Sequence, residues 1–362
     1  MHTIENQYTE FVLDALRDPQ PVQVDEQRRD VVVKLCTDCE TCGGINDRLQ
    51  SVQLTAWHSG EGDVAVIQFG HDHEFVDILL PFICAMCNAS LREGVLPVSQ
   101  KIAIVTPVVK KPGLDPDEPQ SYRSISNLTF MSKIIERIVD EQMRVHLTEC
   151  DLMPPVQSAY RQGLSTEMAL LKVIGDIIDA ADNRKVTLLG LLDVSAALDT
   201  VDHQILLRRL QVSYGIGGQV RQWLTSFLTD RTQLIAFSGV RSTLQSLLCG
   251  VPQGSVLGPL LFALYSADVI KIAASHGVCI HAYADNMQTY AGCAAPDQQI
   301  VTSRLLACVA DIEEWITSNR LTLNADKTEF IWLGTHMSAV SEGQFVSTAD
   351  KWPVHHAAEQ GS

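Results

Sequence analysis

The sequence predicts a mixed α/β fold of the α+β type, with a mostly antiparallel sheet packed on helices. Three observations lead to this prediction. From Ile78 onward, runs with helical spacing alternate with apolar runs of strand length. The run Val186 to Val194 is typical of a strand that is buried on both faces. The segment VCIHAYADNMQTYAG indicates two short strands around an Asp-Asn turn, which is an antiparallel hairpin.

The other elements follow from spacing and from Gly and Pro. The segment Lys101 to Lys111 alternates and is rich in Val and Ile, which predicts a strand, and 114–119 has the composition of a loop. A Gly- and Pro-containing loop, GVPQGSVLG, leads into an apolar helix, and Phe330 to Leu333 returns to strand. Helical spacing of apolar residues predicts further helices within 134–143, 168–181, 199–210, 223–228 and 305–316.

Length and composition exclude disulfide-dense miniature scaffolds, coiled coils, collagens and disordered tails. The chain has 362 residues, of which 46% are hydrophobic and 19% charged, as in an ordinary globular protein. Its most continuous apolar stretch, Val76 to Cys87, carries Asp77 and Pro81 and is shorter than the roughly 20 residues that cross a bilayer. We therefore expect no membrane partner. The first ten residues lack the basic start and apolar run of a secretion signal, so we expect an intracellular protein, cytoplasmic or nuclear and not secreted, with reduced cysteines.

Charge is distributed unevenly along the chain. Residues 1–100 contain 16 acidic and 6 basic side chains, whereas residues 101–335 contain 24 and 20. We expect an acidic, partly irregular region over 1–77 and a flexible polar tail over 336–362. Neither residues 1–100 nor residues 101–335 have the excess of Lys and Arg from which generic nucleic-acid affinity arises.

Two aspartates stand at the ends of apolar strands. Asp193 closes the run that begins at Val186, and Asp285 sits at the tip of the expected hairpin. A buried charge is costly unless it is paired or bound to a metal, and two carboxylates brought together would hold a hard cation such as Mg²⁺. A lone aspartate more often caps a strand or forms a turn, so the pair needs independent support.

That support comes from seven motifs in order. Between about Ile78 and Thr335 the chain resembles the reverse transcriptase domain of non-LTR, LINE-like retrotransposons. The resemblance implies the fingers and palm of a polymerase over 78–335, with too few residues on either side for an endonuclease or a complete thumb. The motifs are LPVSQKIAIVTPVVKK, SYRSISNL, QSAYRQGLST, LLDVSAALDTVDH, GVPQGSVLGPLLF, YADN and LNADKTE.

The resemblance also implies a chemistry. In that family a primer 3′ hydroxyl attacks the α-phosphate of a deoxynucleoside triphosphate on an RNA template, assisted by two Mg²⁺ or Mn²⁺ ions. Asp193 and Asp285 would hold the metal, Asn286 would complete the catalytic tetrapeptide, and Lys327 would protonate the leaving pyrophosphate. The residues implied to contact nucleotide or template are Lys110, Arg123, Val194 through its carbonyl, Leu198, Gln253 and Gly254.

Three positions depart from the family pattern. Asn286 replaces an aspartate, Leu198 replaces the phenylalanine beneath the incoming sugar, and Ser124 replaces a proline. The first removes a negative charge beside the metal site, and the second removes a steric gate. With the incomplete thumb, they leave two functions open: a reverse transcriptase domain with weak or lost catalysis, or a non-enzymatic remnant that acts as a binding or interaction module.

The cysteines suggest a metal site that we do not expect to form. Cys36, Cys39 and Cys42 form a CxxCxxC run, but such spacings are common by chance, so we do not expect zinc or an iron-sulfur cluster there. Cys84 and Cys87 lie one helical turn apart in an apolar stretch. The histidines nearby, His71 and His73, have a spacing that fits solvent exposure better.

Overall fold

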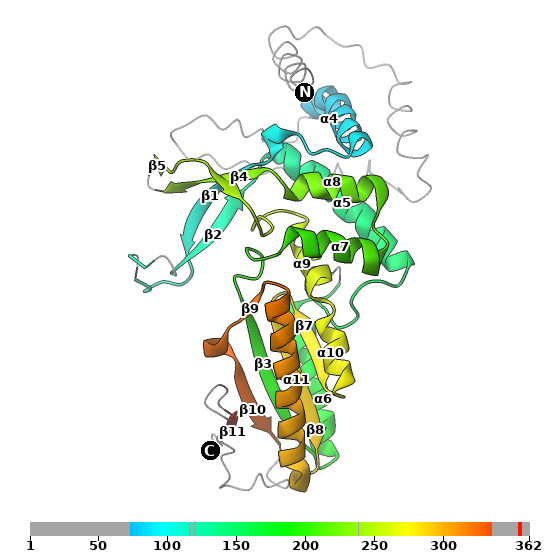
Figure 1. Ribbon diagram of the computed structural model, residues 1–362, viewed down its shortest axis with the longest axis vertical. Coiled ribbons are helices and arrows are strands. Elements are labelled where there is room, and N and C mark those ends of the chain that lie inside the picture. The colour runs from blue at the N-terminus through cyan, green and yellow to red at the C-terminus, as the bar shows by residue number, and fades with distance from the viewer. Residues whose placement is uncertain are drawn as a thin grey trace. The chain divides into compact units, whose positions relative to one another are not determined.

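The computed structural model describes residues 73–334, apart from 116, 119, 120, 162 and 238, and the strand at 354–356 (Figure 1). The chain divides into two units, Met1–Pro97 and Val98–Ser362. The expectations for 1–72, with Cys36, Cys39, Cys42 and His71, and for most of 336–362 lie outside the described residues.

The described part of the first unit is helix α4 (His73–Glu93). Cys84 and Cys87 both lie on this helix. Burial, and to a lesser degree the neighbouring Cys84, raises the pKa of Cys87 to about 12. A thiol with a raised pKa gives up its proton less readily, and it is the thiolate that binds a metal.

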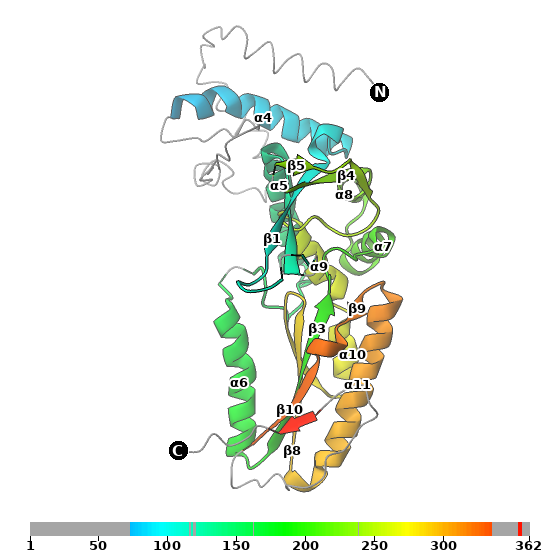
Figure 2. The ribbon, with the colours of Figure 1, turned by 90° about the vertical axis from the view of Figure 1, so that its left-hand side faces the viewer.

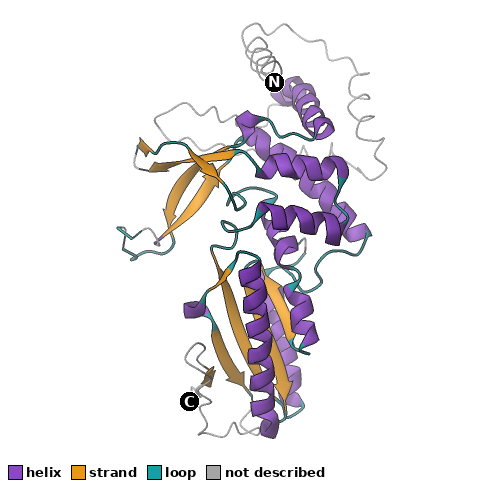
Figure 3. Ribbon diagram, viewed as in Figure 1, coloured by secondary structure: helices purple, strands orange, loops and turns teal. Residues whose placement is uncertain are grey.

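A five-stranded sheet opens the second unit, just after the short helix η1 (Val98–Gln100) (Figure 3). Its strand β1 (Ile102–Val109) pairs antiparallel with β2 (Tyr122–Asn127) and parallel with β4 (Arg231–Phe237). Two short strands, β5 (Val240–Arg241) and β6 (Gln245–Leu247), pair antiparallel with β4.

The second unit also contains a six-stranded sheet, with the order β11-β10-β3-β8-β7 and β9 paired to β3. All its pairs are antiparallel except β10 with β11, so the predicted mostly antiparallel sheet is confirmed. The strands are β3 (Val186–Ser195), β7 (Cys279–Tyr283), β8 (Asn286–Cys293), β9 (Thr322–Leu323), β10 (Glu329–Leu333) and β11 (Val354–His356).

Helices cover both faces of this larger sheet. Helix α6 contacts β3, β7 and β8 on one face, while α10 and α11 contact β7, β8 and β3 on the other (Figure 2). This arrangement explains why β3 has no exposed residue along its length. The helices of the second unit are α5 (Phe130–Glu149), α6 (Thr166–Asp182), α7 (His203–Tyr214), α8 (Gly218–Leu228), α9 (Gly258–Ser266), α10 (Val269–Ser275) and α11 (Gln298–Ser318), with 3₁₀ turns η3 (Ala295–Asp297) and η4 (Ala325–Lys327).

The stretch Gly258–Ser275 has a mean hydropathy of 1.2 over 18 residues, enough by length and composition to cross a membrane. The sequence predicts an apolar helix at the start of this stretch, after the loop GVPQGSVLG. Half of it is buried within the structure, which divides it into α9 and α10. All but two residues of α9 are buried. Packing inside the protein therefore accounts for its apolar character.

The hairpin turn lies one residue earlier than predicted. Tyr283 pairs with Asn286, so the two turn residues are Ala284 and Asp285, and Asn286 already belongs to β8. Ala284 adopts a φ of 58°, a conformation that alanine rarely takes. An Asp-Asn pair tolerates such angles more easily, which is why the sequence favoured the wrong register.

A buried carboxylate ties α5 to the loop ahead of α9. Glu136 is fully buried, and it accepts hydrogen bonds from Ser132 Oγ at 2.8 Å, Val256 N at 2.7 Å and Leu257 N at 3.3 Å. Burial raises the pKa of Glu136, although these bonds and the buried Arg231 oppose the rise. These bonds anchor the C-terminal end of the loop from Gly250 to Leu257 on α5.

Replacing Glu136 should unfold the protein more easily. Glu136→Ala removes the acceptor of three donors and takes a negative charge away from the buried Arg231, which should cost about 3 kcal/mol. The free energy of unfolding from urea titration measures this loss. Glu149→Ala, at the exposed end of the same helix, serves as the control. Losses that agree within about 0.5 kcal/mol would contradict the prediction.

Candidate active site

The pairing of β3 with β8 brings the two strand-end aspartates together. Asp193 lies opposite Asn286 in the antiparallel register, and Asp285 directly precedes Asn286 in the turn. Burial raises the pKa of Asp285, and the negative charge of Asp193 adds to the rise, so the two carboxyl groups are close enough to repel each other.

Asp193 accepts two hydrogen bonds on one oxygen. Lys327 Nζ lies 3.0 Å and Asn324 Nδ2 3.2 Å from Asp193 Oδ2, while the backbone N–H of Asn324 donates to the carbonyl of Asp193 at 2.8 Å. Lys327 is thus located beside the carboxylate pair, on η4. Asn324 was missed by sequence reasoning, although it belongs to the LNADKTE motif and lies three residues ahead of Lys327.

Asp285 is held in a partly buried position where its negative charge is unfavourable. Burial is the main cause of its raised pKa, and Asp193 adds to it, whereas Lys327 and Arg123 act in the opposite direction. Arg123, exposed on β2, is therefore within electrostatic reach of the pair. A cation bound between the carboxylates would relieve this unfavourable charge.

The ligands at this position suit a hard cation. Asn286 is exposed, and its Nδ2 faces Asp285 Oδ1 at 3.5 Å, so an amide stands where a third carboxylate would add charge. Among the described residues, no group of three or more His, Cys, Asp or Glu side chains could hold a metal ion. Asp193 and Asp285 together offer the oxygen ligands that Mg²⁺ prefers, with one negative charge fewer than three carboxylates would supply.

The loop from Gly250 to Leu257 is fixed against both β2 and the segment that follows β3. Gly254 has a φ of 111°, and a Cβ there would lie 2.7 Å from the carbonyl oxygen of Ser126. Ser126 N donates to the carbonyl of Gln253 at 2.7 Å, and Gln253 Nε2 donates to Asp199 Oδ2 at 2.8 Å. Only glycine meets both demands at Gly254.

The remaining expected contact residues are distributed around this loop. Leu198 is half-buried, and its carbonyl accepts the N–H of Val251 at 2.8 Å. Val194 is buried opposite Leu323 on β9. Lys110 directly follows β1, where its side chain is exposed and its N–H donates to Ser121 O at 2.9 Å.

Comparison with known proteins identifies the family. The sequence profile of the family described as "Reverse transcriptase (RNA-dependent DNA polymerase)" matches residues 109–349, more than half of the chain. The chain belongs to the reverse transcriptase family. In the terms of the fingers–palm fold expected from the sequence, we call the smaller sheet (β1, β2, β4, β5, β6) the fingers sheet and the larger one (β3, β7–β11) the palm sheet.

Several relatives come from mobile elements of flies. The chain is 32% identical over 193 residues to the "Probable RNA-directed DNA polymerase from transposon BS" of Drosophila melanogaster, a match that covers 52% of this chain and 20% of the relative. It is 27% identical over 256 residues to the "RNA-directed DNA polymerase from mobile element jockey" of the same species, covering 69% and 27%. The chain thus spans only about a fifth to a quarter of these relatives.

Among solved structures, the apo telomerase from Candida tropicalis truncated from its C-terminal domain is 12% identical, with a TM-score of 0.48. The match covers 72% of this chain and 56% of that one.

Gln157, another residue that sequence reasoning missed, supports the turn that carries Asp285. Its Oε1 accepts the N–H of Ala284 at 3.0 Å, and its Nε2 donates to the carbonyl of Ala284 at 3.2 Å. The same Oε1 accepts the N–H of Ala159 at 3.0 Å. The signal was its place in the QSAYRQGLST motif, but no spacing rule connects that motif with the hairpin.

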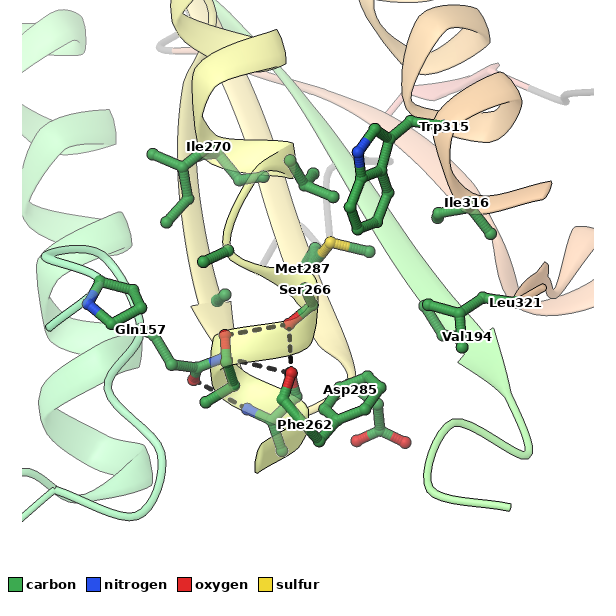
Figure 4. A pocket seen from close by; sticks show the side chains of 17 residues that line it. Gln157, Val194, Phe262, Ser266, Ile270, Asp285, Met287, Trp315, Ile316 and Leu321 are labelled. Atoms are coloured by element: carbon green, nitrogen blue, oxygen red, sulfur yellow. Dashed lines mark hydrogen bonds between the residues drawn. The ribbon is translucent and has the colours of Figure 1, made fainter. Parts of the chain in front are cut away.

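A small, mostly apolar cavity lies in the palm behind the turn. Figure 4 shows the residues that line this cavity, among them Gln157, Asp285, Val194, Met287 and Trp315. Its volume of about 20 Å³ is room for roughly one water molecule. The cavity is therefore too small to be a nucleotide site.

Removing Gln157 should loosen the turn. Gln157→Ala leaves the N–H groups of Ala159 and Ala284 without acceptors, so we expect a loss of about 2 kcal/mol in unfolding free energy. We also expect amide exchange at Ala284 to become at least about tenfold faster, as NMR would measure. Ser158→Ala is the control, because it removes only the neighbouring bond to His281 at 2.8 Å. Unchanged amide exchange at Ala284 in Gln157→Ala would show that the hydrogen bonds of Gln157 do not hold the turn.

Proposed function

We propose that this chain is the fingers and palm of a retrotransposon RNA-directed DNA polymerase whose catalysis is weak or lost. The observation that carries the proposal is the meeting of Asp193 and Asp285 at the ends of paired strands, with Lys327 beside them. Its substrates would be an RNA template, a DNA primer and deoxynucleoside triphosphates. Family membership supports this assignment.

Each residue has a proposed role in nucleotidyl transfer. Asp193 and Asp285 would hold Mg²⁺ or Mn²⁺, which when bound stabilises the attacking and leaving oxygens. Lys327 would give a proton to the leaving pyrophosphate, because its ammonium lies beside Asp193 on the exposed side of the site. Arg123 would neutralise triphosphate charge from the fingers.

The loop from Gly250 to Leu257 would support the template and the incoming base. Its double attachment, to Ser126 on β2 and to Asp199 after β3, supports this role because it couples fingers to palm at the site. Gln253 would have to keep or exchange its bond with Asp199 when nucleic acid binds. Leu198 would lie beneath the sugar, next to the same loop.

The proposed impairment of catalysis rests on the charge that is missing at Asn286. An amide at Asn286 supplies a neutral oxygen and an N–H donor beside Asp285, in place of a carboxylate that would help to balance two divalent ions. This observation also favours the alternative function, a non-enzymatic module that binds nucleic acid or protein. Activity measurements separate the two.

Restoring the carboxylate should raise polymerase activity. Asn286→Asp should increase primer extension on a homopolymer RNA template by about 10²- to 10³-fold, the usual effect of one electrostatic group at a transition state. The assay would be run at several Mg²⁺ and Mn²⁺ concentrations.

Two variants control this test. Asn183→Asp at the end of α6 adds the same charge away from the site and should change nothing. Asp193→Asn in the Asn286→Asp background should abolish extension, and if that double variant extends the primer as well as Asn286→Asp does, the polymerase assignment fails. Robust extension by the natural chain would contradict only the impairment.

Leu198 should affect sugar selection and not turnover. Leu198→Phe would cover the face of the incoming sugar, so in the Asn286→Asp background we expect about tenfold better discrimination against ribonucleotides with similar kcat for deoxynucleotides. Single-nucleotide incorporation kinetics measure both quantities. Leu248→Phe, at an exposed position, is the control. Equal discrimination in the two variants would remove Leu198 from the sugar site.

A further inference from the structure

Helix α6 presents an apolar face on the side opposite the palm sheet. Ala169 and Val173 are its buried residues. Met168, Leu171, Ile174 and Ile178 are exposed, with exposed fractions of 65% for Leu171 and 53% for Ile178. Their spacing of three, three and four places them on one stripe, because 3.6 residues complete a helical turn. Among the described elements, Figure 2 shows the sheet on one side of α6 only.

The middle of this stripe is a glycine. Gly175 lies between Leu171 and Ile178 on the same face, although glycine weakens the interior of a helix. A Cβ at this position would meet nothing within 4 Å, so packing inside the chain does not require glycine. The absence of a side chain instead allows another backbone to approach closely at this point.

Two opposite charges flank the stripe on one side. Lys172 lies three residues before Gly175 and Asp179 four residues after it, and both are exposed. At about 1.5 Å of rise per residue, an antiparallel copy centred on Gly175 would bring each Lys172 to within about 1.5 Å of the level of the partner's Asp179. A two-fold axis at Gly175 leaves the two groups on the same flank of the pair.

We propose that α6 is a dimer interface, in which two copies of this chain pair antiparallel about Gly175. A second copy fits because one two-fold rotation places stripe against stripe, glycine against glycine and each Lys172 beside the Asp179 of the other copy. Lys172 already donates to Asp176 at 2.7 Å. Its ammonium has three donors, so the same group can reach a second carboxylate across the interface.

Sedimentation velocity of the full chain, at about 1 to 100 µM, tests the proposal without any catalytic readout. We expect a monomer–dimer equilibrium that Leu171→Glu and Gly175→Leu shift to monomer. Val212→Glu, which changes an exposed apolar residue of α7, is the matched control and should leave the equilibrium unchanged. A monomer at every concentration, or a dimer that Leu171→Glu leaves intact, overturns the proposal.

Two further variants separate association from folding. Gly175→Ala should raise the Tm of the monomer, because alanine favours the helix, and yet raise the dimer Kd by about tenfold, because the methyl group prevents close approach. Lys172→Glu should weaken the dimer, and Lys172→Glu combined with Asp179→Lys should restore it. A Gly175→Ala chain that dimerises more tightly, or a double variant that does not recover, contradicts the antiparallel arrangement. Slow amide exchange over the stripe in a monomeric chain would assign the face to another segment of the same chain instead.

Discussion

The geometry of the candidate active site depends on one constraint, the antiparallel register between β3 and β8. Asp193 pairs with Asn286, and this pairing fixes where the turn before Asn286 places Asp285. Because side chains alternate between the faces of a strand, a slip of one residue would move the carboxylate to the other face. The register is held by buried apolar residues along β3, which α6 covers on one face and α10 and α11 on the other.

Holding two carboxylates together has an electrostatic cost that the surrounding residues only partly offset. Lys327 and Asn324 both donate to one oxygen of Asp193, and Lys327 and Arg123 counteract the burial of Asp285. The pKa of Asp285 nevertheless stays raised. The site is thus arranged so that a cation would be bound favourably, even though Asn286 supplies no third charge.

Three of the seven non-glycine residues with positive φ among the described residues are found near this site. Ala284, Ala196 and Tyr160 all have positive φ values, at 58°, 48° and 60°, and none is a glycine. Ala284 precedes Asp285, Ala196 follows the end of β3, and Asp285 acts on the pKa of Tyr160. Such conformations persist only where the surroundings impose them, as Gln157 does at Ala284.

The sequence by itself determined the family, the mixed α/β class and the approximate position of most helices and strands from 101 to 333. These follow from local periodicity and from motifs whose order is visible along the chain, as with β1 and α11. The tertiary structure alone decided the exact turn at Ala284–Asp285, the clamp by Gln157 and the bonds of Asn324 and Gln253. Those contacts join segments separated by 54 to 131 residues, and local spacing carries no information about which distant groups will meet. The exposed face of α6 was hidden for the same reason, since an apolar helix face shows its missing partner only when the sheet on its other side is in place.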